Sequence, residues 1–332
     1  MPLAVRRQFL ECRACGVQAE SEVHVLSEMM YGSRETFDYV LCSYCGCLQI
    51  AKVPGDLARH YPSDYYSLQP RQEPPAPTGL KGWLMRWYAQ SAVLRPDDAV
   101  ARAFRSVLPV PTAFLEIGDY LVEAGLTSRY ARILDVGCGA SPSRLAAMRR
   151  LGFSAAEGLD PYVPENLSYE GIPVYRRTID QQPGEYDLIM FHHSLEHVTE
   201  PYIALREAAR LLHPRGTCLV RIPVMGTYFW RHFGTDWVEL DAPRHLQLLT
   251  VKSMDCLAKR VGLRVRKTAF DSEAWELAAS TRYQRGIPLR STPKPADGFS
   301  ASELAAFSSK ASELNAKADG GRACFYLVRD GA

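Results

Sequence analysis

The feature that most constrains the fold is a short apolar run that leads through two glycines into a helical pattern. The run spans 133–136, Gly137 and Gly139 form the turn, and the helical pattern begins near Pro142. Glycines let the backbone approach a ligand closely, and the first turn of a helix offers free N–H groups to an anion. Asp160 ends the next apolar run about 20 residues later, where nucleotide-binding folds place an acid on the ribose hydroxyls. The segment therefore predicts a nucleotide-type cofactor at the ends of two neighbouring strands.

Strand and helix patterns alternate from Arg132 onward. Helical patterns at 142–151 and 201–212 separate apolar runs that have the length of strands. Such alternation is typical of an α/β fold, and we predict a doubly wound, seven-stranded, mainly parallel sheet of the Rossmann-like kind. The predicted strands are 133–136, 156–159, 174–175, 186–191, 218–222, 264–269 and 324–328.

Five of the nine cysteines lie in the first fifth of the sequence, and four of these form two Cys-x-x-Cys-Gly knuckles. Each knuckle brings two thiolates to one metal, and the glycine after it permits the tight turn. Two knuckles supply the four sulfurs of a closed tetrahedral site, so we predict a structural zinc in a small zinc-ribbon-like domain. Two unrelated cysteine pairs or a redox pair are the alternatives. The predicted ligands are Cys12, Cys15, Cys42 and Cys45.

Changes in composition suggest three segments. We predict a zinc-binding four-cysteine module at 1–67, a proline-rich linker with a helical segment at 68–130, and the α/β domain at 131–332. A chain of this length does not need a disulfide framework, so the cysteine usage indicates a reducing, cytoplasmic location. The formal net charge of +2 excludes a strongly basic nucleic-acid-coating protein. No apolar run approaches the roughly 18 residues of a membrane span.

Four blocks together resemble the class I S-adenosylmethionine-dependent methyltransferases. They are the loop at 133–139, Asp160, the segment 186–198 (Tyr-Asp-Leu-Ile-Met-Phe-His-His-Ser-Leu-Glu-His-Val) and the segment 210–216 (Arg-Leu-Leu-His-Pro-Arg-Gly). The resemblance implies S-adenosylmethionine as cofactor, with the loop glycines beside its methionine moiety, Asp160 on its ribose and Asp135 at its amino-acid end. The full set of cofactor-binding residues that we expect is Asp135, Gly137, Cys138, Gly139, Asp160, Thr178, Ile179 and His192.

The loop departs from the family pattern at Ser141, where a third glycine is usual. A dinucleotide is the competing cofactor, and its Gly-x-Gly-x-x-Gly fingerprint needs a glycine where this sequence has Pro142. That mismatch favours S-adenosylmethionine.

Two histidine-containing segments are candidates for the chemistry. Methyl transfer to an oxygen benefits from a base that removes the acceptor's proton. The segment 237–246, which ends Asp-Ala-Pro-Arg-His-Leu, resembles methyltransferases of bacterial polysaccharide and natural-product gene sets. We predict His245 as the leading base and His197 as a second catalytic residue. A cap on the neighbouring helix is the alternative role for His197.

Other roles stay open in the same two segments. Ubiquinone-type O-methyltransferases have a Glu-x-x-Glu-His block that can hold a divalent metal, and His193 replaces the first acid here. A metal on His193, Glu196 and His197 is therefore an alternative. Arg244 either binds an anionic group of the substrate or pins its loop against an acid. The aromatic residues nearby either line an acceptor pocket or belong to the core: Tyr228, Phe229, Trp230 and Trp237.

These observations predict an S-adenosylmethionine-dependent methyltransferase that acts on a small-molecule or glycan acceptor, with O-methylation favoured. The alternative is an RNA or protein methyltransferase whose zinc module holds the macromolecule. The segment 11–54 lacks a Lys/Arg stripe, which disfavours that alternative. A scaffold protein with a vestigial cofactor site is a third possibility, which the intact loop and acids disfavour.

Overall fold

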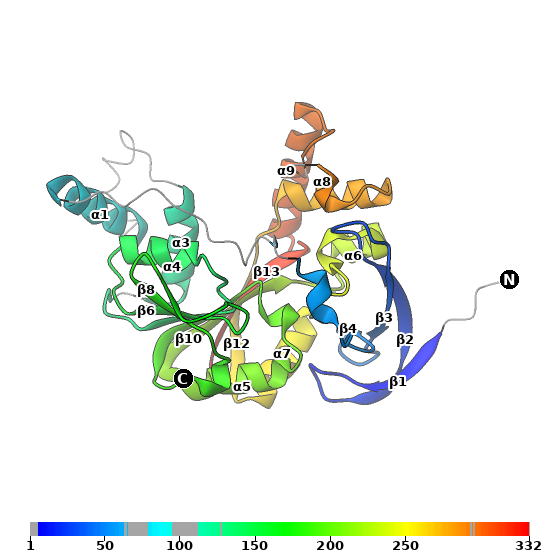
Figure 1. Ribbon diagram of the computed structural model, residues 1–332, viewed down its shortest axis with the longest axis horizontal. Coiled ribbons are helices and arrows are strands. Elements are labelled where there is room, and N and C mark those ends of the chain that lie inside the picture. The colour runs from blue at the N-terminus through cyan, green and yellow to red at the C-terminus, as the bar shows by residue number, and fades with distance from the viewer. Residues whose placement is uncertain are drawn as a thin grey trace. The chain divides into compact units, whose positions relative to one another are not determined.

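The computed structural model describes residues 6–62, 65, 79–94, 112–126, 128–292, 294 and 296–331 (Figure 1). The chain divides into two compact units. The cysteine unit comprises Met1–Pro62, His193–Arg206 and Val220–Asp330. The glycine-loop unit comprises Ser63–His192, Glu207–Leu219 and Gly331–Ala332. Each unit is thus built from separate stretches of sequence.

The glycine-loop unit contains a mainly parallel sheet with strand order β9-β5-β6-β8-β7. β5 pairs in parallel with both β6 and β9, β6 pairs in parallel with β8, and β7 forms an antiparallel hairpin with β8. Most side chains of β5 and β9 are buried, as expected for strands covered on both faces. The strands are β5 (Ile133–Val136), β6 (Ala156–Leu159), β7 (Leu167–Tyr169), β8 (Ile172–Tyr175) and β9 (Tyr186–His192).

Helices accompany this sheet in the order that the sequence predicts. Because β5 and β6 run in the same direction, their carboxyl ends lie at one edge of the sheet, and this brings the glycine loop close to Asp160. α5 (Pro201–Leu211) and β10 (Leu212–Pro223) run from one unit into the other. The remaining helices of this unit are α1 (Gly79–Leu94), α3 (Thr112–Glu123), α4 (Ser143–Arg150) and the 3-10 turn η2 (Ile179–Gln181).

The cysteine unit contains a five-stranded sheet of order β1-β2-β3-β4-β11. The pairs described in it are all antiparallel. Its first four strands are N-terminal, whereas β11 comes from a segment about 200 residues further along the chain. The strands are β1 (Arg7–Glu11), β2 (Gln18–Ser27), β3 (Thr36–Leu41), β4 (Leu48–Ile50) and β11 (Gln247–Leu248).

The C-terminal part of this unit supplies two long strands and most of its helices. β12 (Leu263–Phe270) and β13 (Arg322–Arg329) pair antiparallel, and β13 also neighbours β10. Ser300 caps α9 and Thr250 caps α7 through their side chains. The helices are α6 (Tyr228–Phe233), α7 (Val251–Arg260), α8 (Ala274–Gln284) and α9 (Ala301–Ala316), with 3-10 turns η1 (Leu57–His60), η3 (Leu195–His197), η4 (Gly234–Asp236), η5 (Val238–Leu240) and η6 (Leu289–Ser291).

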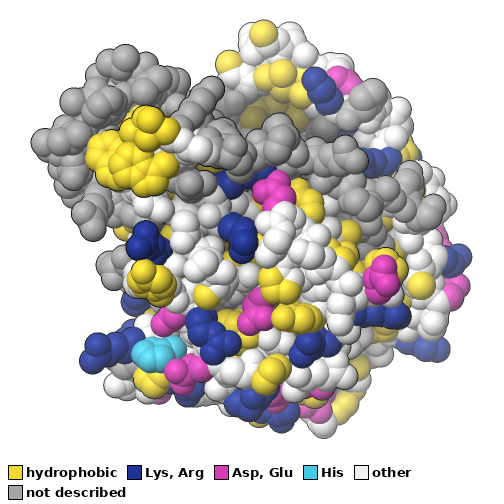
Figure 2. Space-filling model, turned by 60° about the vertical axis from the view of Figure 1, so that its left-hand side comes forward, with side chains coloured by type: hydrophobic (Ala, Val, Ile, Leu, Met, Phe, Trp, Pro, Cys, Tyr) yellow, Lys and Arg dark blue, Asp and Glu magenta, His cyan; other side chains and the backbone are white. Residues whose placement is uncertain are grey.

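The surface carries charges of both signs. Figure 2 shows Lys and Arg side chains interspersed with Asp and Glu side chains on the face that it draws. Exposed ion pairs such as Arg6–Asp38 and Lys317–Glu313 fit this mixture. Among the described residues, no helix combines the length and the apolar character needed to cross a membrane.

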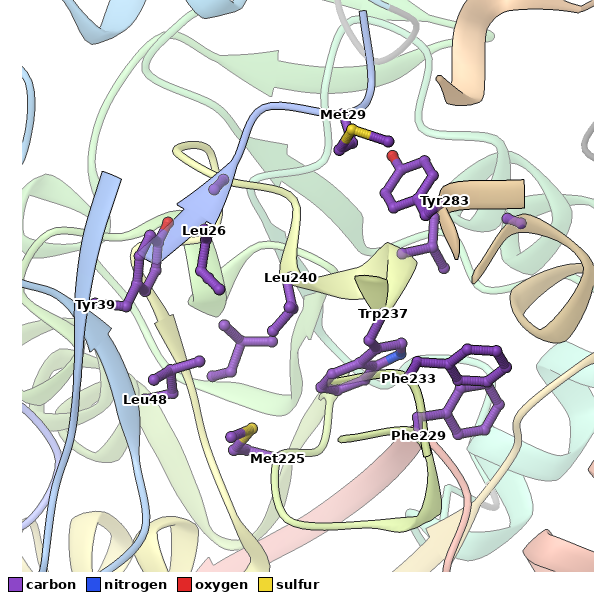
Figure 3. Close-up of a cluster of buried hydrophobic side chains, with 14 of the residues drawn as sticks. Leu26, Met29, Tyr39, Leu48, Met225, Phe229, Phe233, Trp237, Leu240 and Tyr283 are labelled. Atoms are coloured by element: carbon purple, nitrogen blue, oxygen red, sulfur yellow. The ribbon is translucent and has the colours of Figure 1, made fainter. Parts of the chain in front are cut away.

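One hydrophobic core joins the N-terminal strands to the C-terminal part of the cysteine unit (Figure 3). Tyr39 and Leu48 from the N-terminal strands belong to the same cluster as Phe229, Trp237 and Leu240. Trp237 and Phe229 are both 0% exposed. Of the four aromatic residues that the sequence left open between pocket and core, Phe229 and Trp237 thus belong to the core. Tyr228 and Trp230 are only partly buried against the same cluster.

The predicted α/β class is confirmed. All seven predicted strands are present, and β7 adds a short strand that the sequence pattern did not indicate. The proline-rich stretch of the predicted linker lies outside the described residues. The predicted domain boundaries stay a prediction.

Gly158 on β6 permits the close approach of the glycine loop. A Cβ atom at this position would lie 2.5 Å from the Cys138 sulfur. We expect Gly158→Ala to lower the free energy of unfolding by about 1–3 kcal/mol, because the added methyl group overpacks the contact. Urea unfolding measures this change. Cys138→Ala in the same chain removes the clashing sulfur and should restore part of the loss; a double variant no more stable than Gly158→Ala would contradict this explanation.

Candidate active site

The glycine loop of the glycine-loop unit has the conformation that the sequence predicts. Gly137 and Gly139 have φ angles of 75° and 71°, in the left-handed region that glycine adopts without strain. The Gly137 N–H donates to the Leu159 carbonyl oxygen at 2.7 Å, and the Gly139 N–H donates to a carboxylate oxygen of Asp160 at 2.9 Å. The loop is thus tied directly to the end of β6.

Asp160 lies buried at that end with both carboxylate oxygens engaged. One oxygen accepts from the Gly139 N–H, and the other accepts from the Tyr162 N–H at 2.8 Å. Burial raises the pKa of Asp160, and the backbone N–H groups oppose this rise. Each carboxylate oxygen can accept a further hydrogen bond, so the side chain can still hold a pair of ribose hydroxyls.

Asp135, the second acid of the predicted cofactor site, is 0% exposed. Among the described residues, no hydrogen-bond donor reaches either of its oxygens, and the Arg144 guanidinium is 3.6 Å away. Burial raises the pKa of Asp135 to about 6, although Arg144 opposes the rise. A buried carboxylate without donors fits the amino group of an amino-acid moiety, which would supply both charge and N–H donors.

The other predicted cofactor residues also belong to the glycine-loop unit. Thr178 begins the 3-10 turn η2, and the Ile179 side chain is buried there. Cys138 is buried in the loop. His192 ends β9, and its ring makes an edge contact with Tyr120 at 5.9 Å between centroids. The roles of these residues stay predictions.

The cysteine unit brings the four predicted metal ligands together. The distance between the sulfurs of Cys12 and Cys45 is 3.5 Å, and that between the sulfurs of Cys15 and Cys42 is 3.8 Å. A tetrahedral zinc with Zn–S bonds of about 2.3 Å requires sulfurs about 3.8 Å apart. The Cys45 thiol, followed by that of Cys47, lowers the pKa of the Cys12 thiol. Both the spacing and the thiol chemistry therefore fit a zinc ion.

The two knuckles have the same backbone geometry. The Gly16 N–H donates to the Cys12 carbonyl oxygen at 2.8 Å, and the Gly46 N–H donates to the Cys42 carbonyl oxygen at 2.9 Å. Gly16 and Gly46 have φ angles of 75° and 74°. The glycine after each Cys-x-x-Cys pair thus makes the turn that the sequence predicts.

His197 and His245, the predicted catalytic pair, lie side by side in the cysteine unit. Their ring centroids are 4.6 Å apart in an edge-to-face arrangement. The Nδ1 of His245 lies 2.7 Å from the Glu239 carbonyl oxygen, and the Nδ1 of His197 lies 2.9 Å from the Arg244 carbonyl oxygen. A carbonyl oxygen only accepts, so each Nδ1 carries the proton and each Nε2 is left as the basic nitrogen.

The environment of His197 keeps its ring neutral. Burial, followed by the nearby His245, lowers the pKa of His197 to about 3. The Tyr61 hydroxyl lies 3.2 Å from the His197 Nδ1. His197 is therefore held in place as a neutral imidazole near pH 7.

Glu196 lies beside the two imidazoles and forms with them a cluster of three potential metal ligands. Its carboxylate and the two rings each offer one ligand atom, and these atoms lie within 4.8 Å of one another. The Oε2 of Glu196 is buried without a hydrogen-bond partner among the described residues, and burial raises the pKa of this side chain. The Nδ1 of His193 lies 3.3 Å from the other carboxylate oxygen of Glu196, Oε1, and its Nε2 faces the Arg221 guanidinium. The clustered set among the described residues is thus Glu196, His197 and His245, whereas the alternative metal set contained His193 in place of His245.

Of the two roles that the sequence left open for Arg244, the structure shows the second, a contact that pins its loop against an acid. The Arg244 side chain is 0% exposed. The guanidinium donates to Asp241, to Glu28 at 2.8 Å and to the His60 carbonyl oxygen at 3.2 Å. Arg244 therefore pins its loop internally and has no face left for substrate.

The sequence patterns did not reveal several residues around His245. Tyr39 donates its hydroxyl to the His245 carbonyl oxygen at 2.7 Å, and Glu239 accepts from the His245 ring. Tyr39 and Glu28 lie about 200 residues before His245 in the sequence. No local pattern marks them, because tertiary folding alone brings them to this loop.

The α/β sheet, the glycine loop and the acid at the end of β6 together define a class I S-adenosylmethionine-dependent methyltransferase domain. A family model described as a methyltransferase domain matches residues 100–268, just over half of the chain. The chain therefore belongs to this methyltransferase domain family.

Curated relatives match a shorter part. The ubiquinone biosynthesis O-methyltransferase of Methylococcus capsulatus is 29% identical over 130 residues, which cover 36% of this chain and 52% of the relative. The protein of the same name from Bordetella bronchiseptica is 33% identical over 98 residues, covering 26% of this chain and 39% of the relative. The chain thus spans about half or less of the length of these relatives.

Solved structures resemble the chain at lower identity. An O-methyltransferase from a trans-AT PKS multienzyme of Brevibacillus brevis, in complex with S-adenosyl-L-homocysteine, has a TM-score of 0.41 and 11% identity. That match covers 73% of this chain and 79% of the other.

The raised pKa of Asp135 predicts a pH-dependent cofactor affinity. Ionised Asp135 attracts the amino group of the cofactor, whereas the protonated form does not. Because the pKa is about 6, we expect the affinity for S-adenosylhomocysteine to fall as the pH is lowered through this value. Titration calorimetry between about pH 5 and about pH 7.5 measures the dependence.

Two variants separate this effect from a general loss of binding. Asp135→Asn should bind more weakly above pH 6 and should lose the pH dependence in this range. Asp160→Ala should weaken binding at every pH while the dependence remains. An unchanged pH profile in Asp135→Asn would exclude Asp135 as its source.

Proposed function

We propose that this protein transfers the methyl group of S-adenosylmethionine to an oxygen atom of a small-molecule or glycan acceptor, with His245 as the base. S-adenosylmethionine supplies an electrophilic methyl group on a sulfonium. Asp135, the glycine loop and Asp160 would hold its amino-acid and ribose parts, as their unfilled hydrogen-bonding capacity indicates. Transfer of this kind depends on orientation and on exclusion of water, so a well-ordered binding loop contributes directly to the rate.

The single observation that carries the proposal is the 2.7 Å contact between the His245 Nδ1 and the Glu239 carbonyl oxygen. The Glu239 carbonyl oxygen holds the proton on Nδ1, so Nε2 can accept the proton of an acceptor hydroxyl. His197 stays neutral and is fixed by the Arg244 carbonyl oxygen, and its ring packs edge-to-face against the His245 ring. An acceptor hydroxyl has one proton to donate, so His245 Nε2 would receive it while the His197 ring holds the His245 ring in place.

The acceptor class rests on two supporting points. The curated relatives that match are named as O-methyltransferases of ubiquinone biosynthesis, which have a small-molecule acceptor. The formal net charge is only +2, and positive and negative side chains are mixed on the surface shown in Figure 2. Neither point favours a nucleic-acid acceptor, whose phosphates call for a basic tract.

We also propose that the four knuckle cysteines hold a structural zinc. Their sulfur spacing matches a tetrahedral site, and four thiolates leave no ligand position for substrate. None of the nine cysteines forms a disulfide, which supports a reducing compartment such as the cytoplasm.

The role of His245 predicts a separation of turnover from cofactor binding. We expect His245→Asn to lower methyl transfer by about 100-fold or more, because general-base catalysis contributes at least that factor. The measurement is transfer of a tritiated methyl group to a panel of phenols, sugars and lipids. S-adenosylhomocysteine affinity should not change.

His232→Asn is the matched control, since this histidine stacks on Tyr228 outside the pair. It should leave the rate within about two-fold of that of the unchanged protein, as is usual for surface positions. Label appearing only in RNA or protein fractions would overturn the proposed acceptor class. Full turnover in His245→Asn would exclude this residue as the base.

The zinc proposal predicts the metal content. Elemental analysis should find one zinc per chain, and Cys12→Ser or Cys45→Ser should lose it because three sulfurs no longer close the site. Cys256→Ser, a cysteine on α7 outside the cluster, should retain the metal. Protein prepared without chelators that contains no zinc would contradict the proposal.

A further inference from the structure

The segment that carries His245 continues as a strand of the cysteine unit's N-terminal sheet. β11 starts two residues after His245 and pairs antiparallel with β4, with Gln247 opposite Gln49 and Leu248 opposite Leu48. The Ile50 N–H also donates to the Leu246 carbonyl oxygen at 2.9 Å. β4 itself begins directly after Cys47, at the end of the second knuckle. The backbone directly after His245 is thus hydrogen-bonded to β4, the strand that follows the second knuckle.

The first knuckle reaches the same segment through Arg13, which lies between Cys12 and Cys15. The Arg13 guanidinium donates to the Leu246 carbonyl oxygen at 3.2 Å. Its backbone N–H donates to the Gln49 side chain at 2.8 Å, and that side chain donates to the Glu11 carbonyl oxygen at 2.9 Å. Arg13 therefore connects the first knuckle both to β4 and to the residue after His245.

α7, which follows β11, is contacted by the two knuckles at its opposite ends. At its N-terminus, the Thr250 hydroxyl donates to the Cys45 carbonyl oxygen at 2.7 Å. At its C-terminus, the Arg260 guanidinium donates to the Ala14 carbonyl oxygen at 2.7 Å. A metal that joins the knuckles thus fixes the positions of both contacts at once.

Three donors from the N-terminal part of the chain bind the carbonyl oxygens of His245 and Leu246. The Tyr39 hydroxyl donates to the His245 oxygen. The Arg13 guanidinium and the Ile50 N–H both donate to the Leu246 oxygen. We infer that Arg13 is a positioning residue for His245, and that the four-cysteine site sets the orientation of the catalytic imidazole through Arg13 and β4. This inference rests on the proposed role of His245.

The positioning has a chemical consequence. The His245 ring keeps its proton on Nδ1 only while it stays in line with the Glu239 carbonyl oxygen. A shift of the backbone at Leu246 would break this alignment and mix the two tautomers. A displacement of about 1 Å at a catalytic group can lower a rate by about 100-fold.

Nitrogen NMR of histidine-labelled full-length protein tests the inference without an acceptor. The His245 signal is identified by its absence in His245→Asn. We expect the unchanged protein to show one Nδ1-protonated form, and Arg13→Gln to lose this single signal while zinc content and S-adenosylhomocysteine affinity persist. Arg13→Lys should restore it, because a lysine can still donate to the Leu246 carbonyl oxygen.

Arg7→Gln is the matched control, since Arg7 makes an exposed ion pair with Glu20 on the same sheet. It should leave the His245 signal unchanged. Tyr39→Phe decides the case if Arg13→Gln loses zinc, because Tyr39 lies on β3 outside the knuckles and contacts the His245 carbonyl oxygen directly. We expect it to disturb the same signal.

An unchanged His245 signal in Arg13→Gln that retains zinc, or in Tyr39→Phe, would overturn the inference. That result is distinct from failure of the proposed function, which would show as full turnover in His245→Asn. If Arg13→Gln disturbs the His245 signal while His245→Asn keeps full turnover, Arg13 positions His245 but His245 is not the base.

Discussion

The cysteine unit depends on one fully buried cation, the guanidinium of Arg244. Burying a charge is costly unless it is paired and hydrogen-bonded, and Arg244 meets this need with Asp241, Glu28 and the His60 carbonyl oxygen. Burial alone would raise the pKa of Asp241, but the guanidinium lowers it. The pKa of Glu28 is also lowered against the effect of burial, first by the hydrogen bond from the Tyr31 N–H and then by the guanidinium. These lowered pKa values stabilise the fold above the ordinary carboxyl range, and the stabilisation is lost as the pH falls below that range and through the lowered values.

The ion pairs of Arg244 also explain how the loop that contains His245 can hold a catalytic residue in place. Arg244 precedes His245, and its carbonyl oxygen accepts from His197, so one residue fixes the backbone beside both imidazoles. The ring protons are then assigned by carbonyl oxygens instead of carboxylates. An imidazole bound in this way has one defined basic nitrogen, because a carbonyl oxygen can only accept a hydrogen bond. The cofactor residues are organised differently, because the ends of parallel strands position them in the glycine-loop unit.

Sequence patterns predicted the elements whose signals are local. The glycines of the loop and of both knuckles occupy positive-φ positions, as the predicted turns require. The cysteine spacing predicted four sulfurs around one point, and these sulfurs do cluster. For Arg244 the sequence left two roles open, and only the structure decided between them. An arginine beside a histidine in a charged loop has the same local pattern whether it faces substrate or is buried against Glu28.

The sequence by itself therefore determined the α/β class, the cofactor loop and the knuckles, since backbone geometry and ligand spacing act over a few residues. Tertiary structure alone decided what surrounds His245. Tyr39, Glu28 and Arg13 are more than 200 residues away in the chain, and only the joining of β11 to the N-terminal sheet brings them to this loop. The same pairing joins the segment that follows His245 to the sheet whose strands flank the knuckles. Long-range strand pairing is set by the burial of a shared core, which no single segment encodes.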